Sequence, residues 1–146
     1  PIMRISEIDL QCEDIMWFAI DDHGNVFECT SAGCGNVPEY VCRSREETEA
    51  LLEYFTTRAP VITTAKLLIP ADGSDLVADV SDLASKGIYC FDIIDYDDEE
   101  HYGCVAIPEK ALNIAELPSN IQNILSDHRQ PGDISSMRSI AVAHAY

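Results

Sequence analysis

The sequence predicts an α+β fold: a single domain over residues 1–146, in which two to three helices pack on an antiparallel sheet built from two hairpins. Three observations lead to this prediction. The chain has 146 residues, a common length for one domain. Two pairs of apolar segments each flank a short turn, and two amphipathic segments lie between the pairs. Strand pairs joined by turns, rather than parallel strands joined by helices, are typical of α+β proteins.

The first pair of strands is predicted at 15–21 and 26–31. The first segment is rich in aromatic and branched side chains, and the second alternates apolar and polar residues. Between them, Gly24 and Asn25 readily adopt positive φ, which favours a turn. A calcium loop would need acidic ligands at alternate positions through twelve residues, whereas Val26 resumes a strand. We therefore interpret the Asp and His side chains of this stretch as parts of a turn.

Two helices are predicted after this hairpin. Ser44 and Glu47 have the spacing of a capping box, and the helix that they start is expected to end before Pro60. The following segment, 61–69, is expected to be extended. The second helix starts near Ser74 and stops at Gly87, because apolar residues recur between them at spacings of three and four. The predicted core includes Trp17, Phe18, Leu51, Leu52, Tyr54 and Phe55.

The second hairpin is predicted at 88–96 and 101–107, on either side of an acidic turn at 97–100. Beyond it the pattern is weaker. A short helix at 117–125 and a last strand at 139–146 complete the predicted elements.

The charge of the chain restricts its partners. Nine Lys and Arg residues face 26 Asp and Glu residues, which gives a net charge of −17. Such a surface repels nucleic acids and anionic membranes, and attracts basic proteins. We therefore expect a basic protein partner, with an acidic surface that serves only solubility as the alternative. No 18-residue apolar run and no signal-peptide pattern is present, so we expect a cytoplasmic protein.

The six cysteines do not have the spacing of a metal site. Structural zinc sites use ligand pairs two to four residues apart, and neither the cysteines nor the histidines form such a pair. In a reducing compartment these cysteines are expected to be small buried hydrophobic residues. Glycine-rich phosphate loops are also absent, so no cofactor is predicted.

Three enzymatic alternatives remain open. Cys34, between two glycines, would be a nucleophile if a histidine lay beside it, the candidates being His23, His101, His128 and His144. A carboxylate pair from the acidic segment 92–100 is the second. Pro1 is the third, since some tautomerases use an N-terminal proline as a base and begin Pro-Ile, although the basic helix of that superfamily is missing here.

Two surfaces are the candidates for partner binding. The first is the loop 33–39, which we expect to be exposed, and the second is the acidic segment that ends the third predicted strand. Their candidate contact residues are Gly33, Cys34, Gly35, Asn36 and Glu39 in the loop, and Asp92, Asp95, Asp97, Asp98, Glu99 and Glu100 in the acidic segment.

The N-terminal quarter carries a resemblance. The residues in question are Trp17-Phe18, Ile20-Asp21, Gly24-Asn25, Ser31, Gly33, Gly35 and Val37-Pro38-Glu39. In this pattern the chain resembles small acidic uncharacterised bacterial proteins, some of which are regarded as immunity proteins of toxin systems. The resemblance implies a protein that binds and neutralises a cognate toxin. A regulatory or structural subunit of another complex is an alternative that differs only in its partner.

Overall fold

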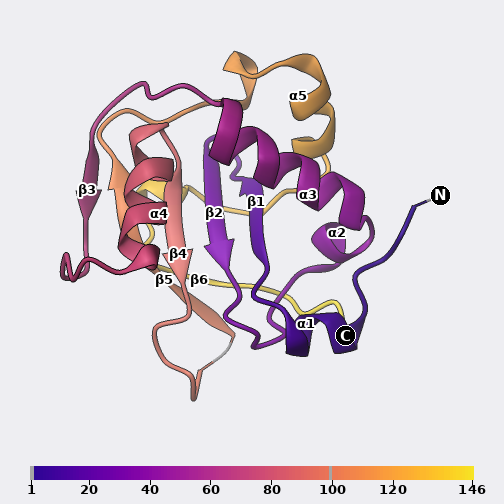
Figure 1. Ribbon diagram of the computed structural model, residues 1–146. Coiled ribbons are helices and arrows are strands. Elements are labelled where there is room, and N and C mark those ends of the chain that lie inside the picture. Colours follow the sequence, from indigo (N-terminus) through magenta and orange to yellow (C-terminus); the bar gives the residue numbers. More distant parts are fainter. Residues whose placement is uncertain (1, 99) are drawn as a thin grey trace.

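A computed structural model describes residues 2–98 and 100–146, which form a six-stranded sheet with helices against it (Figure 1). The strands lie in the order β1-β2-β4-β5-β3, and β6 also pairs with β5. The fold class is therefore α+β. The strands are β1 (Met16–Ile20), β2 (Val26–Thr30), β3 (Ala65–Leu67), β4 (Tyr89–Asp92), β5 (His101–Pro108) and β6 (Ser139–Ala141). The α-helices are α1 (Glu7–Cys12), α2 (Glu39–Cys42), α3 (Arg45–Glu53), α4 (Asp75–Ser85) and α5 (Ser119–Leu125).

The sheet is mixed, which corrects the prediction of an antiparallel sheet. β1 pairs antiparallel with β2, and β4 pairs antiparallel with β5. The central pair, β2 and β4, is parallel, with Phe27 opposite Tyr89. The chain leaves the end of β2, forms α2, α3, β3 and α4, and crosses back to the end of the sheet where β2 began before it enters β4. Such a long crossover permits a parallel pair, and local turn patterns cannot reveal which distant strand becomes the neighbour.

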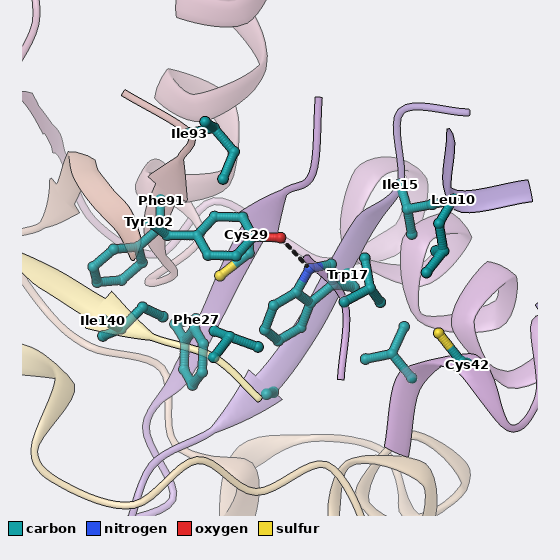
Figure 2. Close-up of a cluster of buried hydrophobic side chains, with 14 of the residues drawn as sticks. Leu10, Ile15, Trp17, Phe27, Cys29, Cys42, Phe91, Ile93, Tyr102 and Ile140 are labelled. Carbon is teal, nitrogen blue, oxygen red and sulfur yellow. Dashed lines mark hydrogen bonds between the residues drawn. The ribbon is translucent and has the colours of Figure 1, made fainter. Parts of the chain in front are cut away.

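Successive residues of the strands point to opposite faces of the sheet, and both faces are covered. On one face, Phe18 packs with Leu51 and Phe55 from the α3 segment and with Val80 and Leu83 of α4. Figure 1 shows α3 and α4 side by side on this face, which we call the helix face. On the other face, Trp17 is the centre of an aromatic cluster that also contains Phe27, Phe91 and Tyr102 (Figure 2).

The helix starts follow the predicted serines. Ser44 Oγ accepts the Glu47 amide at 3.2 Å, and Ser74 Oγ accepts the Val77 amide at 3.3 Å. The α3 segment continues as a π-helix at Tyr54–Arg58, the last turns before Pro60. Lys86, just after α4, is buried and donates to the carbonyls of Phe55 at 2.8 Å and Thr56 at 3.2 Å. This lysine therefore satisfies backbone groups at the wide π-turn and ties it to α4.

Four of the predicted core residues, Trp17, Phe18, Leu51 and Phe55, are buried, whereas Leu52 and Tyr54 are only partly so. The cysteines at 29, 42, 90 and 104 are buried, as expected of small hydrophobic residues, and Cys12 is exposed. Among the helices within residues 2–98 and 100–146, none combines the length and the apolar character needed to cross a membrane.

Candidate functional site

The period of two in the strands places acidic and hydroxyl groups on the helix face. Phe18 of β1 lies opposite Glu28 of β2, and Glu28 lies opposite Cys90 of β4. Two residues further along, Thr30 lies opposite Asp92. Phe18 and Cys90 belong to the core beneath α3 and α4, so Glu28, Thr30 and Asp92 lie on that same face.

A surface cavity of about 330 Å³ lies where β2 and β4 end and α4 begins. Thr30 and Asp92 form the part of its wall that belongs to the sheet. The first turns of α4 form another part, with Asp75, Leu76 and Asp79. Four of its wall residues carry carboxylates: Asp14, Asp75, Asp79 and Asp92. We call this the acidic cavity.

Glu28 does not line the acidic cavity itself but is hydrogen-bonded to one of its wall residues, Thr30. Its side chain has no exposed surface, and Thr30 Oγ1 donates to its Oε1 at 2.5 Å. Its Oε2 makes no hydrogen bond of ordinary geometry within the described residues, and the weakly donating Cys90 thiol is the other side-chain donor beside the carboxyl. Because Thr30 itself lines the cavity, this bond directs the Glu28 carboxyl towards the cavity end of β2.

Burial changes the acidity of two carboxyls here. Burial raises the pKa of Glu28 to about 8, and the nearby charges of Asp92 and Asp14 act in the same direction. Burial also raises the pKa of Asp92 to about 6, with a further contribution from Asp14. The Thr30 hydroxyl and the Ile93 amide oppose these shifts by donating to Glu28 and Asp92 respectively. At neutral pH the buried glutamate is therefore mainly protonated.

No ion pair between described residues includes a carboxylate of the acidic cavity. The cations that form pairs do so elsewhere: Arg4 with Glu39, Arg43 with Asp127, Arg45 with Asp9, Glu13 and Glu49, Arg58 with Glu53, and Lys86 with Asp82. Asp14 instead accepts the Ala32 amide at 2.7 Å, and Asp92 accepts the Ile93 amide at 2.8 Å. The cavity thus concentrates negative potential that the chain itself does not neutralise.

Apolar surface adjoins the acidic cavity. A second cavity of about 460 Å³ shares Met16 and Asp79 with it and follows the groove between α3 and α4. On the other side, the chain leaving β4 carries Ile94 and Tyr96, whose exposed fractions are 62% and 65%. Tyr96 also lines the acidic cavity.

The structure separates Asp92 from the rest of the predicted acidic segment. Asp95, Asp97, Asp98 and Glu100 are exposed, and Glu99 lies outside the described residues. Asp98 Oδ1 lies 2.9 Å from His101 Nδ1, and this hydrogen bond raises the pKa of the histidine. Among the described residues of this set, Asp92 is the one that lines one of the described cavities and is half-buried.

The loop 33–39 is less exposed than predicted. Asn36 is fully buried, and its carbonyl accepts a hydrogen bond from the Tyr102 hydroxyl. Glu39 is exposed, but both its oxygens accept from the Arg4 guanidinium, at 2.5 and 2.6 Å. Asn36 and Glu39 are therefore already in contact with other parts of the chain, and the C-terminal segment adds a hydrogen bond from the Ala145 amide to the Val37 carbonyl.

Cys34 and Gly35 line a different cavity, of about 150 Å³, together with His144. Of the four histidines considered as a base, His144 shares this cavity with Cys34, and the other three do not line it. His128 is buried, with its Nδ1 2.9 Å from the Phe18 carbonyl oxygen, and its pKa is lowered by burial. The loop and the acidic segment do not form a common cavity among those described.

The Asp21–Asn25 stretch is a turn held by its first aspartate. Asp21 is buried, and its Oδ1 accepts the amides of His23 and Asn25, both at 2.9 Å. Its Oδ2 accepts the amide of Ile134 at 2.8 Å. In the part of the chain that the structure describes, no group of three or more His, Cys, Asp or Glu residues is arranged to hold a metal ion.

Sequence reasoning missed most of the acidic cavity. Asp14, Asp75 and Asp79 are distant in sequence from Asp92 and resemble ordinary charged surface residues. Glu28 stands at a polar position of the alternating pattern at 26–31 and was not among the candidate site residues, but every residue of β2 is buried. One feature of the sequence could have indicated a buried glutamate. Glu28 lies between Phe27 and Cys29, in a strand whose other residues are compatible with burial on both faces of the sheet.

Comparisons with protein-family models, with curated proteins and with solved structures give no match for this chain.

Proposed function

We propose that this chain is a binding module for a basic protein in the cytoplasm, and in its most specific form an immunity protein that binds and neutralises a bacterial toxin. One observation carries the proposal. Four carboxylates without ion pairs among the described residues adjoin two exposed apolar side chains, Ile94 and Tyr96. Protein interfaces commonly combine an aromatic anchor with complementary charge.

The net charge of −17 supports the same proposal, because it accelerates the approach of a basic partner over long range. The toxin-immunity version has one further support, the resemblance in residues 17–39. A regulatory subunit with a basic partner would use the same surface.

Purification of the tagged chain from its native host tests the proposal. We expect a stoichiometric basic protein to copurify, with an affinity that falls as the salt concentration rises. Absence of a partner, or an affinity that salt does not change, would contradict the proposal.

Tyr96→Ala locates the contact. This substitution should weaken binding about tenfold or more, as loss of an aromatic anchor does. Val61→Ala is the matched control, because Val61 is another exposed apolar residue, with an exposed fraction of 64%, that lines none of the cavities described here.

A second candidate function, a thiol-dependent enzyme, is supported by the cavity that Cys34 shares with His144. An imidazole beside a thiol can accept its proton and produce the nucleophilic thiolate. The alkylation rate of Cys34 by iodoacetamide tests this candidate. An activated thiol would react rapidly at pH 6 and slow down in the His144→Asn variant, whereas an ordinary thiol becomes reactive only near pH 8.5.

A further inference from the structure

The acidic cavity has the chemistry of a receptor for one basic side chain. We infer that a lysine or arginine side chain of the protein partner enters this cavity, with its charged end among Asp14, Asp79 and Asp92 and in front of Glu28. The inference rests on the proposed function and assigns the site at which that function is performed.

Glu28 is the observation that distinguishes this cavity from an ordinary acidic surface. A carboxyl with no exposed surface normally has a cation or a full set of hydrogen bonds, because burying it otherwise is unfavourable. Here Thr30, a wall residue, donates to Oε1, while the only other side-chain donor to the carboxyl within residues 2–98 and 100–146 is the weakly donating Cys90 thiol, and Oε2 makes no hydrogen bond of ordinary geometry. The Cys90 thiol also lies 3.7 Å from the carbonyl oxygen of Val80 and 3.6 Å from that of Ile88. These two carbonyls compete with Glu28 for the single thiol hydrogen.

The cavity also suits the rest of a basic side chain. Its wall includes Met16, Leu76 and Tyr96, against which the methylene groups of lysine or arginine can pack. Its volume of about 330 Å³ is sufficient for one such side chain. The mouth lies beside the exposed Tyr96, so the partner's backbone can remain outside while its side chain enters.

The exposed acidic turn offers a weaker site for the same cation. Asp95 and Asp97 are surrounded by water, and Asp98 already pairs with His101. Ion pairs in such surroundings contribute little, whereas the half-buried Asp92 interacts with a cation through a medium of lower polarity. The two acidic surfaces can therefore be separated by experiment.

Binding of a cation here should be linked to proton release. The groups that face the Glu28 carboxyl are Asp92 and Cys90 from β4, Thr30 from β2 and Asp14 from the segment before β1, with Cys29 on the opposite face. From the helices, Asp75 and Asp79 of α4 face the cavity, while α3 contributes the apolar Leu51 to the core. A cation among these acids favours the ionised forms of Asp92 and Glu28, so affinity should rise between pH 5 and 8.

Two charge-matched double variants test the location. The probes are the N-acetylated, C-amidated peptides hexalysine and hexaarginine, with affinity measured by isothermal titration calorimetry at pH 7.5. Asp14→Asn with Asp92→Asn removes two charges from the cavity, and Asp95→Asn with Asp97→Asn removes two from the turn. Each asparagine oxygen can still accept the amide hydrogen bond that Asp14, Asp92 or Asp95 accepts, so both variants should fold.

We expect the cavity variant to lose about tenfold or more in affinity and the turn variant to lose less than about threefold. Equal losses would mean that binding depends on net charge alone, and would overturn the inference. A larger loss in the turn variant, or no binding of either peptide by the native chain, would also overturn it.

Glu28→Gln tests the linkage without altering the cavity wall. Titrations at pH 7 in buffers of different ionisation enthalpy give the number of protons released on binding. We expect a fraction of a proton to be released by the native chain and a smaller fraction by the variant. Equal release would overturn the assignment of Glu28 to this site.

These outcomes are distinct from failure of the proposed function. If the native partner binds in a salt-dependent manner and the cavity variant binds it unchanged, the inference fails and the proposed function remains. If no basic partner exists, the proposed function fails, whatever the peptides show.

Discussion

Thr30 Oγ1 donates a 2.5 Å hydrogen bond to Oε1 of Glu28, a glutamate with no exposed surface in the middle of a central strand. The two side chains lie two residues apart on β2, so both point to the helix face. This contact joins the buried acid to the wall of the acidic cavity, and it leads to the first prediction.

Replacement of Glu28 by glutamine should stabilise the chain increasingly as the pH rises. The pKa of Glu28 is raised from an ordinary 4.5 to about 8 in the folded state. Between these values the unfolded chain loses the proton that the folded chain retains, so native stability falls with pH, by up to about 1.4 kcal/mol per pH unit. Glutamine has no such proton and removes this dependence.

Urea unfolding of both proteins at pH 5 and pH 7.5 measures this effect. Between the two conditions the variant should gain about 3 kcal/mol in unfolding free energy relative to the native chain. A constant difference between the two proteins would show that Glu28 ionises normally in the folded state.

Tyr102→Phe should destabilise the aromatic core. The Tyr102 hydroxyl accepts from Trp17 Nε1 at 3.3 Å and donates to the Asn36 carbonyl, as the dashed line in Figure 2 shows for the first bond. Removal of this hydroxyl leaves a buried indole N–H without its acceptor, a loss of about 1–3 kcal/mol. Urea unfolding followed by Trp17 fluorescence gives the value.

Tyr40→Phe is the control for Tyr102→Phe. Tyr40 also contacts Trp17 edge to face, with ring centroids 6.1 Å apart. Its hydroxyl, however, is buried and has no hydrogen-bond partner in the described part of the chain. Its removal should be neutral or stabilising, and an equal loss in both variants would contradict the role assigned to the Tyr102 hydroxyl.

Gly87→Ala should be strongly destabilising. Gly87 has a φ of +92°, which an L residue adopts at a cost of roughly 1–2 kcal/mol. A Cβ at this position would also lie 2.7 Å from the backbone nitrogen and from the Cβ of Leu112. Overpacking of this kind adds about 1–3 kcal/mol.

Gly73→Ala separates the two effects, because Gly73 has a φ of +75° and a Cβ there would meet no atom within 4 Å. Thermal unfolding should show a small decrease for this variant and a much larger one for Gly87→Ala. Similar decreases would mean that only the backbone angle matters.

Lys86→Met should loosen the junction between the π-helix and α4. The Lys86 ammonium donates to two carbonyls and pairs with Asp82 at 2.9 Å, and removal of a charged hydrogen-bond donor costs about 1.5–3 kcal/mol. Amide hydrogen exchange at Tyr54–Arg58 should accelerate. Asp82→Asn is the control: its side chain is half-exposed, so its loss should change stability by less than about 1 kcal/mol.

Local patterns predicted local structure well. Ser44 and Ser74 start helices because their hydroxyls reach amides three residues on, which depends only on nearby sequence. The capping box predicted at Ser44 is only half formed: its side chain accepts the Glu47 amide, but within the described residues the Glu47 carboxylate does not accept the Ser44 backbone amide, and the Ser44 hydroxyl donates to Glu46 Oε2 at 3.5 Å. The turn at Asp21 was equally accessible, because its amide partners His23 and Asn25 lie within four residues.

The acidic cavity was not accessible in this way. Its carboxylates come together only when β4 docks beside β2 and α4 crosses the end of the sheet. Asp92 was predicted as a site residue because it belongs to a visible run of acids, and Glu28 was not, because its burial depends on which strand covers the free edge of β2. The spacing of residues along the sequence does not indicate which distant segments become neighbours in the folded chain.

The parallel pairing of β2 with β4 also has a consequence for folding. Until α3 and α4 are in place and β4 docks, the strands β1 and β2 leave one edge of β2 open, and open edges recruit strands from other chains. In a chain in which β4 has not docked, Glu28 is solvated and, with its ordinary pKa of 4.5, is ionised at neutral pH, so that its charge opposes pairing of the open edge with another chain. When β4 pairs with β2, the Glu28 carboxyl takes up a proton and becomes buried in the core. The side chain that opposes misassembly in the open chain is thus a neutral core residue in the native fold.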